Sequence, residues 1–236
     1  MIDATNLEND SEARILIVDD HPILRQGLAD LINMQSDMVV CADVEDGHAA
    51  ITALPSAKPQ LAVIDISLPG MDGIELIKRL RKQDERCLIL VLSMHDESIY
   101  AERVLGAGAR GYIMKQEVRG NILSAIRKIL DGGIWLSDAM TTQILSRIDT
   151  SRDVSSTSPI SSLSNRELEV LTLIGEGKGP KDIAVELSIS IRTVDAHRAH
   201  IKKKLNLKDA RSLFQYAIEW LRNETSARQP PTLHSR

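Results

Sequence analysis

Short apolar runs alternate with segments of helical spacing over residues 14–131. Five runs, at 15–18, 38–42, 61–65, 88–92 and 110–114, are mostly aliphatic and bounded by turn residues, which predicts buried strands. After each run, apolar residues recur every three or four positions, which predicts a helix. Five strand–helix units of this length indicate a parallel sheet covered by helices on both faces.

The pattern changes after Gly132 and Gly133. A short helix is expected at 138–147, and the Ser-rich stretch 150–162 has a composition that cannot bury a core, which favours a flexible linker. From residue 163 the apolar spacing is helical throughout, and Ser164 with Glu167 forms a capping box. Helices are expected at about 165–176, from Pro180, and at about 191–205 and 209–221.

The charge distribution supports a division into two domains. Residues 160–236 carry 13 Lys and Arg against 9 Asp and Glu, whereas residues 1–159 carry 16 against 24. A basic back half is a candidate for nucleic-acid binding. We therefore predict an α/β domain at 14–131, a linker with one short helix at 132–162, an all-α domain at 163–223, and flexible tails at 1–13 and 224–236.

The composition indicates aliphatic cores and no membrane association. Hydrophobic residues make up 43% of the chain and aromatic residues 3%. No apolar run approaches the roughly 18 residues that span a membrane, and the polar, acidic start is unlike a signal peptide. We expect a cytoplasmic protein in which Cys41 and Cys87 are core thiols rather than a disulfide or a metal site.

Polar side chains stand where the predicted strands end. Asp19 and Asp20 follow the first strand, Asp65 ends the third, Ser93 follows the fourth and Lys115 follows the fifth. Ligands of an open α/β sheet bind beyond the carboxyl ends of its strands, so these groups should meet in one pocket. The set contains carboxylates and no Cys or His, which suits Mg²⁺ better than Zn²⁺.

The chemistry of this set points to phosphoryl transfer. A carboxylate is a competent nucleophile toward phosphorus. A lysine and a hydroxyl can stabilise the phosphoryl oxygens, and a divalent cation can offset the repulsion between carboxylates. The pocket is therefore predicted to make and break an aspartyl phosphate.

Residues 14–131, with these positions in this order, resemble the receiver domain of two-component systems, which has a flavodoxin-like sheet of order 2-1-3-4-5. The resemblance implies that Asp65 is the phosphoacceptor, and that Asp20, helped by Asp19, and the backbone carbonyl of Ser67 complete a Mg²⁺ site. It also implies the following roles: Ser93 as switch hydroxyl, Lys115 as phosphate-pairing lysine and Tyr112 as aromatic switch, with plain core packing as the alternative for Tyr112. Gln116 stands where many receivers have Pro, and a cis bond without Pro costs roughly 2.5–4 kcal/mol, so the Lys115–Gln116 bond is left open between cis and a differently built trans turn.

The helix expected at 191–205 has one apolar stripe, formed by Val194, Ile201 and Leu205. The opposite face is small and polar, and its alanines allow close approach to base edges while its basic residues can meet phosphates. The candidate DNA-binding residues are Arg192, Thr193, Asp195, Ala196, Ala199, His200, Lys202 and Lys203. A solvated helix face is the alternative.

The segment 163–221 resembles the LuxR-type helix–turn–helix, through residues 163–171, 182–184, 192–198, Ile201, Lys204 and Leu205. Together with the receiver this is the NarL/FixJ type of response regulator. Two departures are Gly179-Pro180 in place of a polar cap, and Asp195, an acid on the groove face. The resemblance implies a recognition helix at 191–205 and a dimer contact in the last helix.

We therefore expect a DNA-binding transcriptional response regulator and not a turnover enzyme. A sensor histidine kinase would phosphorylate Asp65, and the phosphorylated protein would dimerise on promoter DNA with half-sites about one helical turn apart. Three alternatives remain at this point. They are a phosphatase of the haloacid dehalogenase type, a regulator that ignores phosphorylation, and an RNA-binding protein.

Overall fold

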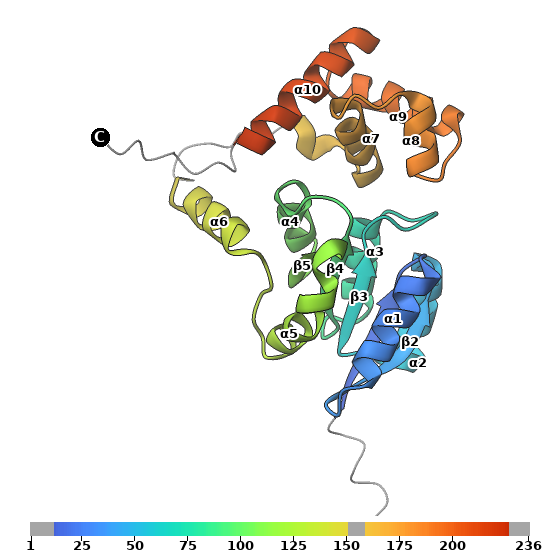
Figure 1. Cartoon of the computed structure of the whole chain (residues 1–236), viewed down its shortest axis with the longest axis vertical. Coiled ribbons are helices and arrows are strands. Elements are labelled where there is room, and N and C mark those ends of the chain that lie inside the picture. The colour runs from blue at the N-terminus through green and yellow to red at the C-terminus, as the bar shows by residue number, and fades with distance from the viewer. Residues whose placement is uncertain (1–11, 151–158, 227–236) are drawn as a thin grey trace, which may run out of the picture. The chain divides into compact units, whose positions relative to one another are not determined.

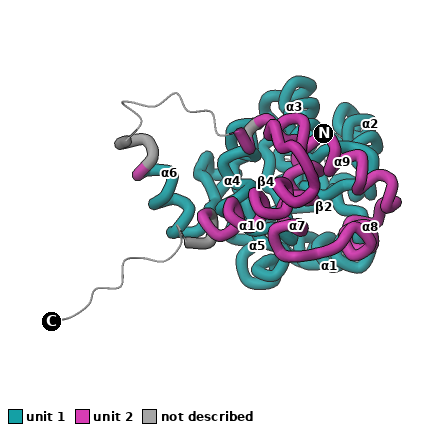
Figure 2. Tube along the Cα trace, turned by 90° about the horizontal axis from the view of Figure 1, so that it is seen from above, with its two compact units in different colours: residues 1–145 teal, residues 146–236 magenta. Residues whose placement is uncertain are grey.

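The computed structural model of the chain describes residues 12–150 and 159–226. They divide into two compact units, residues 1–145 and 146–236 (Figure 2). Residues 1–11, 151–158 and 227–236 lie outside the description, and with them most of the predicted tails and the middle of the predicted linker. No helix among the described residues has the length and apolar character needed to cross a bilayer.

The first unit is a five-stranded parallel sheet with helices on both faces (Figure 1). The strand order β2-β1-β3-β4-β5 confirms the predicted flavodoxin-like order. The strands are β1 (Ala13–Val18), β2 (Met38–Val44), β3 (Leu61–Asp65), β4 (Leu88–Ser93) and β5 (Gly111–Met114). The helices are α1 (Pro22–Asn33), α2 (Gly47–Ala57), α3 (Gly73–Gln83), α4 (Glu97–Gly106) and α5 (Val118–Leu130), with a short 3₁₀ helix η2 (Lys115–Glu117) before α5.

Both faces of the sheet are buried, which explains why its strands are nearly continuous apolar runs. Ile15, Ile17 and Val63 pack in one cluster with residues of α1 and α5. The alternate residues Leu16 and Ala62 are equally buried on the other face, where α2, α3 and α4 are neighbours of one another. The sheet is therefore fixed in register, and its carboxyl ends converge on one edge.

Aspartates begin three of the helices of this unit. The side chains of Asp46, Asp72 and Asp96 accept hydrogen bonds from backbone N–H groups in the first turns of α2, α3 and α4. Such caps satisfy donors that a helix leaves unpaired at its start, and each is worth about 1 kcal/mol. The loops between strand ends and helices are thereby held in place locally.

The edge of β5 is covered by a residue that the sequence assigned to the linker. Trp135 forms a parallel bridge with Gly111. Its carbonyl accepts a hydrogen bond from the N–H of Tyr112 at 3.0 Å, and its N–H donates to the carbonyl of Arg110 at 3.0 Å. Open edge strands expose unpaired backbone groups, and this pairing satisfies part of that edge. Residues 132–145 are thus part of the first unit and not of a linker.

The helix α6 (Asp138–Thr150) starts from this covered edge. The N–H of Ser137 donates to Oε1 of Glu97 at 3.0 Å, and the hydroxyl of Ser137 accepts from the N–H of Met140 at 3.1 Å. Met140 is buried. The expected short helix is therefore present, longer than predicted, and its first turn is anchored to the start of α4.

The second unit is all-helical, as predicted. It contains a 3₁₀ helix η3 (Pro159–Ser162) and the helices α7 (Asn165–Gly175), α8 (Pro180–Glu186), α9 (Ile191–Lys204) and α10 (Ala210–Ser226). Two boundaries differ from the prediction: Ile160, in the predicted linker, is buried, and α10 continues past residue 224, where a tail was predicted. α7 and α10 approach closely, because a Cβ on Gly175 would lie 2.7 Å from the carbonyl oxygen of Ala217.

Candidate phosphoacceptor pocket and recognition helix

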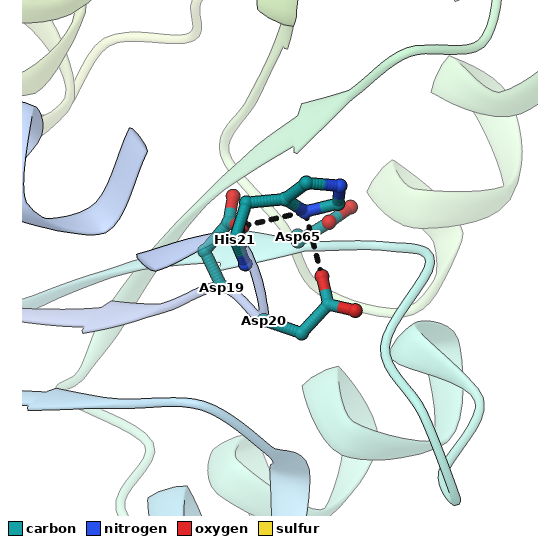
Figure 3. Close-up of side chains that lie close together, drawn as sticks. All are labelled: Asp19, Asp20, His21 and Asp65. Atoms are coloured by element: carbon teal, nitrogen blue, oxygen red, sulfur yellow. Dashed lines mark hydrogen bonds and ion pairs between the residues drawn. The ribbon is translucent and has the colours of Figure 1, made fainter. Parts of the chain in front are cut away.

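An acidic pocket lies at the carboxyl ends of β1 and β3 (Figure 3). One ligand atom each from Asp19, Asp20, His21 and Asp65 lies within 4.8 Å of the others. Asp19 and Asp65 are 1% and 2% exposed. Charges this deeply buried require compensation by a counter-ion.

Lys115 supplies that compensation. Its Nζ lies 2.6 Å from Oδ2 of Asp65 and 2.8 Å from Oδ2 of Asp19. Burial raises the pKa of Asp65, and the ammonium of Lys115 opposes this shift. Burial also acts to lower the pKa of Lys115, but the carboxylates of Asp65 and Asp19 outweigh it and raise that pKa. The lysine therefore remains charged between two carboxylates.

The loop after β3 fixes the backbone around Asp65. The N–H of Ser67 donates to Oδ1 of Asp65 at 2.9 Å. Gly70 has φ of +75°, a conformation that favours glycine. A Cβ on Gly73 would lie 2.5 Å from the carbonyl oxygen of Ile66, so only glycine fits where α3 begins. On the other side of the pocket, the Lys115–Gln116 bond, which the sequence left open, is trans, and it lies in the short helix η2.

Ser93 and Tyr112 both hold the loop that follows β4. The hydroxyl oxygen of Ser93 accepts a hydrogen bond from the N–H of His95 at 3.0 Å, and the hydroxyl of Tyr112 donates to the carbonyl of His95 at 2.8 Å. Tyr112 is buried, and burial raises the pKa of its hydroxyl. The side chain of Tyr112 is thus part of the core and also attached to the loop that follows Ser93, the predicted switch hydroxyl.

In the second unit, α9 presents the face that the sequence assigned to DNA. Val194 and Ile201 are fully buried. The predicted contacts Arg192, Thr193, Asp195, Ala196, Ala199, His200 and Lys203 are exposed, and Lys202 is half-buried. Ser190 caps the helix by accepting from the N–H of Thr193 at 3.0 Å.

Comparisons with known proteins identify both domains. The model of the response regulator receiver domain matches residues 15–127, and that of bacterial regulatory proteins of the luxR family matches residues 161–217. Oxygen regulatory protein NreC of Staphylococcus haemolyticus is 37% identical over 210 residues, which cover 87% of this chain and 97% of the relative. This chain belongs to the two-component response regulators of the receiver plus LuxR-type class.

Solved response regulators have the same architecture. A LuxR-family two-component response regulator from Aurantimonas sp. SI85-9A1 is 34% identical, with a TM-score of 0.54 over 59% of this chain and 99% of its own. RcsB from Salmonella enterica serovar Typhimurium, bound to promoter rprA in the presence of the phosphomimetic BeF3⁻, is 27% identical. Its TM-score is 0.56 over 88% of this chain and 98% of its own. The protein is therefore a DNA-binding response regulator, and its family comprises transcription factors rather than turnover enzymes.

Two histidines lie at the receiver pocket of this response regulator that were not predicted from the sequence. His21 was left out of the predicted ligand set, yet its Nδ1 lies 2.7 Å from Oδ1 of Asp20 and 3.1 Å from Oδ1 of Asp19. His95 lies beside the hydroxyl of Ser67, with Nε2 at 3.1 Å, and its ring stacks on Tyr100 with centroids 5.0 Å apart. A signal was available, because His21 directly follows Asp20 and His95 stands two residues after Ser93.

The helix α9 is also tied to α7. Nζ of Lys204 lies 2.7 Å from Oε2 of Glu167, whose other contacts include the N–H of Ser164 at 2.8 Å. Although burial acts to raise the pKa of Glu167, Lys204 and Ser164 outweigh it and lower that pKa. The capping box predicted from Ser164 and Glu167 is present and extends, through Lys204, to the end of α9. On the face predicted to meet DNA, Nη1 of Arg198 lies 3.3 Å from Oδ1 of Asp195, so this acidic side chain has a basic neighbour.

Proposed function

We propose that a sensor histidine kinase phosphorylates this response regulator on Asp65 in the presence of Mg²⁺, and that the phosphorylated protein dimerises on promoter DNA. The observation that carries the proposal is the pairing of a buried Asp65 carboxylate with Lys115 at 2.6 Å, beside Asp19 and Asp20. A structural ion pair alone would not require two further carboxylates at the same strand ends.

The residues of the pocket fit a hard divalent cation. Asp19, Asp20 and Asp65 supply carboxylate oxygens, and the backbone carbonyl of Ser67 is the fourth candidate ligand. Oδ1 of Asp20 is buried and has no hydrogen-bond partner among the described residues, which leaves a lone pair for an ion. When bound, Mg²⁺ neutralises carboxylate charge and phosphoryl oxygens.

In the proposed reaction, a carboxylate oxygen of Asp65 attacks the phosphorus of a phosphohistidine. The oxygen–phosphorus bond forms as the nitrogen–phosphorus bond of the donor breaks, and the imidazole leaves. Lys115 shifts from the carboxylate to a phosphoryl oxygen, because the negative charge moves there. Ser93 turns its hydroxyl from the N–H of His95 to another phosphoryl oxygen.

The rotation of the Ser93 hydroxyl would transmit the phosphorylated state from the pocket to the start of α4. The loop after β4 loses its bond to Ser93, and the hydroxyl of Tyr112, which holds the carbonyl of His95, moves with it. The start of α4 follows, and Glu97 in this first turn holds Ser137 at the start of α6. We propose that this displacement favours the dimer, in the cytoplasm, with α9 of each protomer in a major groove.

Phosphorylation is tested with acetyl phosphate and Mg²⁺ by intact mass and peptide mapping. We expect one phosphate on Asp65, none on Asp65→Asn, and normal labelling of Asp43→Asn, which changes an exposed carboxylate on β2. Labelling of another residue, or equal DNA affinity of the wild type and Asp65→Asn with and without acetyl phosphate, would refute the proposal. The second result would identify a regulator that ignores phosphorylation.

DNA binding is tested with fragments selected from genomic DNA, by fluorescence anisotropy at several salt concentrations. Lys203→Ala should weaken binding to every fragment and reduce the slope of log K against log salt by about 0.9. Lys82→Ala, an exposed lysine on α3, is the matched control and should leave the slope unchanged. An unchanged slope for Lys203→Ala removes this residue from the interface, and preference for RNA in competition would favour the RNA-binding alternative.

A further inference from the structure

His21 lies over the acidic pocket with its ring nitrogen directed at the carboxylates (Figure 3). Nδ1 is 2.7 Å from Oδ1 of Asp20, 3.1 Å from Oδ1 of Asp19 and 3.5 Å from Nζ of Lys115. Although His21 is the N-cap residue of α1, its side chain makes no capping hydrogen bond. The imidazole is therefore directed at the pocket for a reason other than helix capping.

The spacing of these atoms is compatible with ligands around one ion. Without an ion, Nδ1 of His21 is within hydrogen-bond distance of Oδ1 of Asp19 at 3.1 Å. Two ligands each about 2.1 Å from a metal and at right angles lie about 3 Å apart, so a divalent ion could replace the proton between these atoms without a large movement of the side chains. Nδ1 of His21 and Oδ1 of Asp20 lie at the distance of an ion pair. Oδ1 of Asp20 nevertheless has no hydrogen-bond partner among the described residues, so the angles of this contact are not those of a hydrogen bond.

Lys115 and His21 contact different carboxylate oxygens of the pocket. Lys115 lies against Oδ2 of Asp19 and Oδ2 of Asp65, whereas His21 faces Oδ1 of Asp19 and Oδ1 of Asp20. A cation on the His21 side would thus share Asp19 with the lysine, which keeps its own oxygens on Asp19 and Asp65 but gives up its 3.5 Å contact with Nδ1 of His21. The side chain of His21 is 62% exposed, so the ion can enter from solvent on that side.

An imidazole changes which ions the pocket favours. Mg²⁺ binds oxygen ligands and releases its waters reluctantly, whereas nitrogen ligands suit divalent ions from Fe²⁺ to Zn²⁺. We infer that His21 is a metal ligand of this pocket, and that it makes the receiver bind a divalent transition-metal ion more tightly than Mg²⁺. This inference rests on the proposed metal site and assigns to it a nitrogen ligand and a class of ion.

The test is calorimetric titration of the untagged full-length protein with Ni²⁺ and, separately, Mg²⁺. His21→Asn keeps a polar residue suited to a helix N-cap, and His48→Asn, which changes an exposed histidine on α2, is the matched control. We expect His21→Asn to weaken Ni²⁺ binding at least about tenfold and to change Mg²⁺ binding less than about twofold. His48→Asn should change neither, and Mg²⁺ should compete with Ni²⁺ in the wild type.

A spectroscopic measurement makes the ligand visible directly. Pulsed electron paramagnetic resonance of the Cu²⁺-loaded protein should show coupling to an imidazole ¹⁴N that disappears in His21→Asn and persists in His48→Asn. Equal Ni²⁺ affinity of the wild type and His21→Asn, or a nitrogen coupling that His21→Asn leaves unchanged, would overturn the inference. Neither result touches the proposed function, which would fail instead through absent phosphorylation of Asp65 with Mg²⁺.

Discussion

Replacing Lys115 with methionine should destabilise the receiver by about 3–5 kcal/mol at neutral pH, because it leaves two buried carboxylates without their cation. The size follows from burial. The side chains of Lys115, Asp19 and Asp65 are 6%, 1% and 2% exposed, so the small values typical of surface ion pairs do not apply. A loss of this size approaches the whole stability of many domains.

The pH dependence of this loss has a definite sign. Burial raises the pKa of Asp65 in the folded state, and Lys115 opposes that shift, so the variant raises this pKa further. A carboxyl group whose pKa is higher in the folded than in the unfolded state contributes most to the free energy of unfolding below its unfolded-state pKa. That contribution is lost as pH rises through the folded-state pKa. The deficit of Lys115→Met should therefore grow from acid to neutral pH.

Mg²⁺ should recover part of the deficit. An ion present at ten times its Kd stabilises the folded state by about 1.4 kcal/mol. The gain should be larger in Lys115→Met than in the wild type, because the ammonium no longer competes for the carboxylates.

The assay follows urea unfolding by tryptophan fluorescence. The chain has two tryptophans, Trp135 on the receiver and Trp220 on α10, so a Trp220→Phe background reports the receiver alone. Lys78→Met, an exposed lysine on α3, is the control. A loss below about 1 kcal/mol at neutral pH without Mg²⁺, or a deficit that does not change with pH, would refute this reasoning.

Two further predictions concern other parts of the chain. Glu167→Gln should destabilise the second unit by about 1–3 kcal/mol at neutral pH, because it weakens the bond to Lys204. Because the folded-state pKa of Glu167 is lowered, the difference from the wild type should shrink as pH falls through that pKa in thermal unfolding. Gly73→Ala should destabilise the receiver by about 1–3 kcal/mol in urea, since its Cβ would meet the backbone of Ile66. An unchanged midpoint would show that the loop after β3 can shift at little cost.

The pocket could be predicted because its residues stand at the ends of apolar runs. Asp65 closes a strand whose five residues are all buried, and Ser93 is the last residue of β4. Once the runs are parallel strands of one sheet, their ends must meet. The closeness of His21 to Asp20 and of His95 to Ser93 in the sequence was a signal that these rings could reach the pocket. The rotamers that place His21 over the acids and His95 beside Ser67 leave no mark in the sequence, so that placement was not predicted.

The residue that covers the sheet edge could likewise not be predicted from the sequence. Trp135 pairs with β5 through a single bridging residue, and a single residue cannot show the alternating pattern by which a strand is recognised in a sequence. The ion pair between Lys204 and Glu167 joins positions 37 residues apart, although the sequence predicted Glu167 only as part of a capping box. In both cases the contact depends on how elements pack.

The amino-acid sequence was enough to predict the strands and helices of the receiver, the helical second unit and the group of residues that meet at the strand ends. It could do so because period and turn chemistry act over a few residues and leave local marks, whereas the strand order followed from the resemblance to receiver domains. The folded chain alone revealed where His21 and His95 lie, that residues 132–145 extend the receiver, and that α9 is tied to α7. Those features depend on contacts between distant segments, whose energies arise only after the backbone has folded.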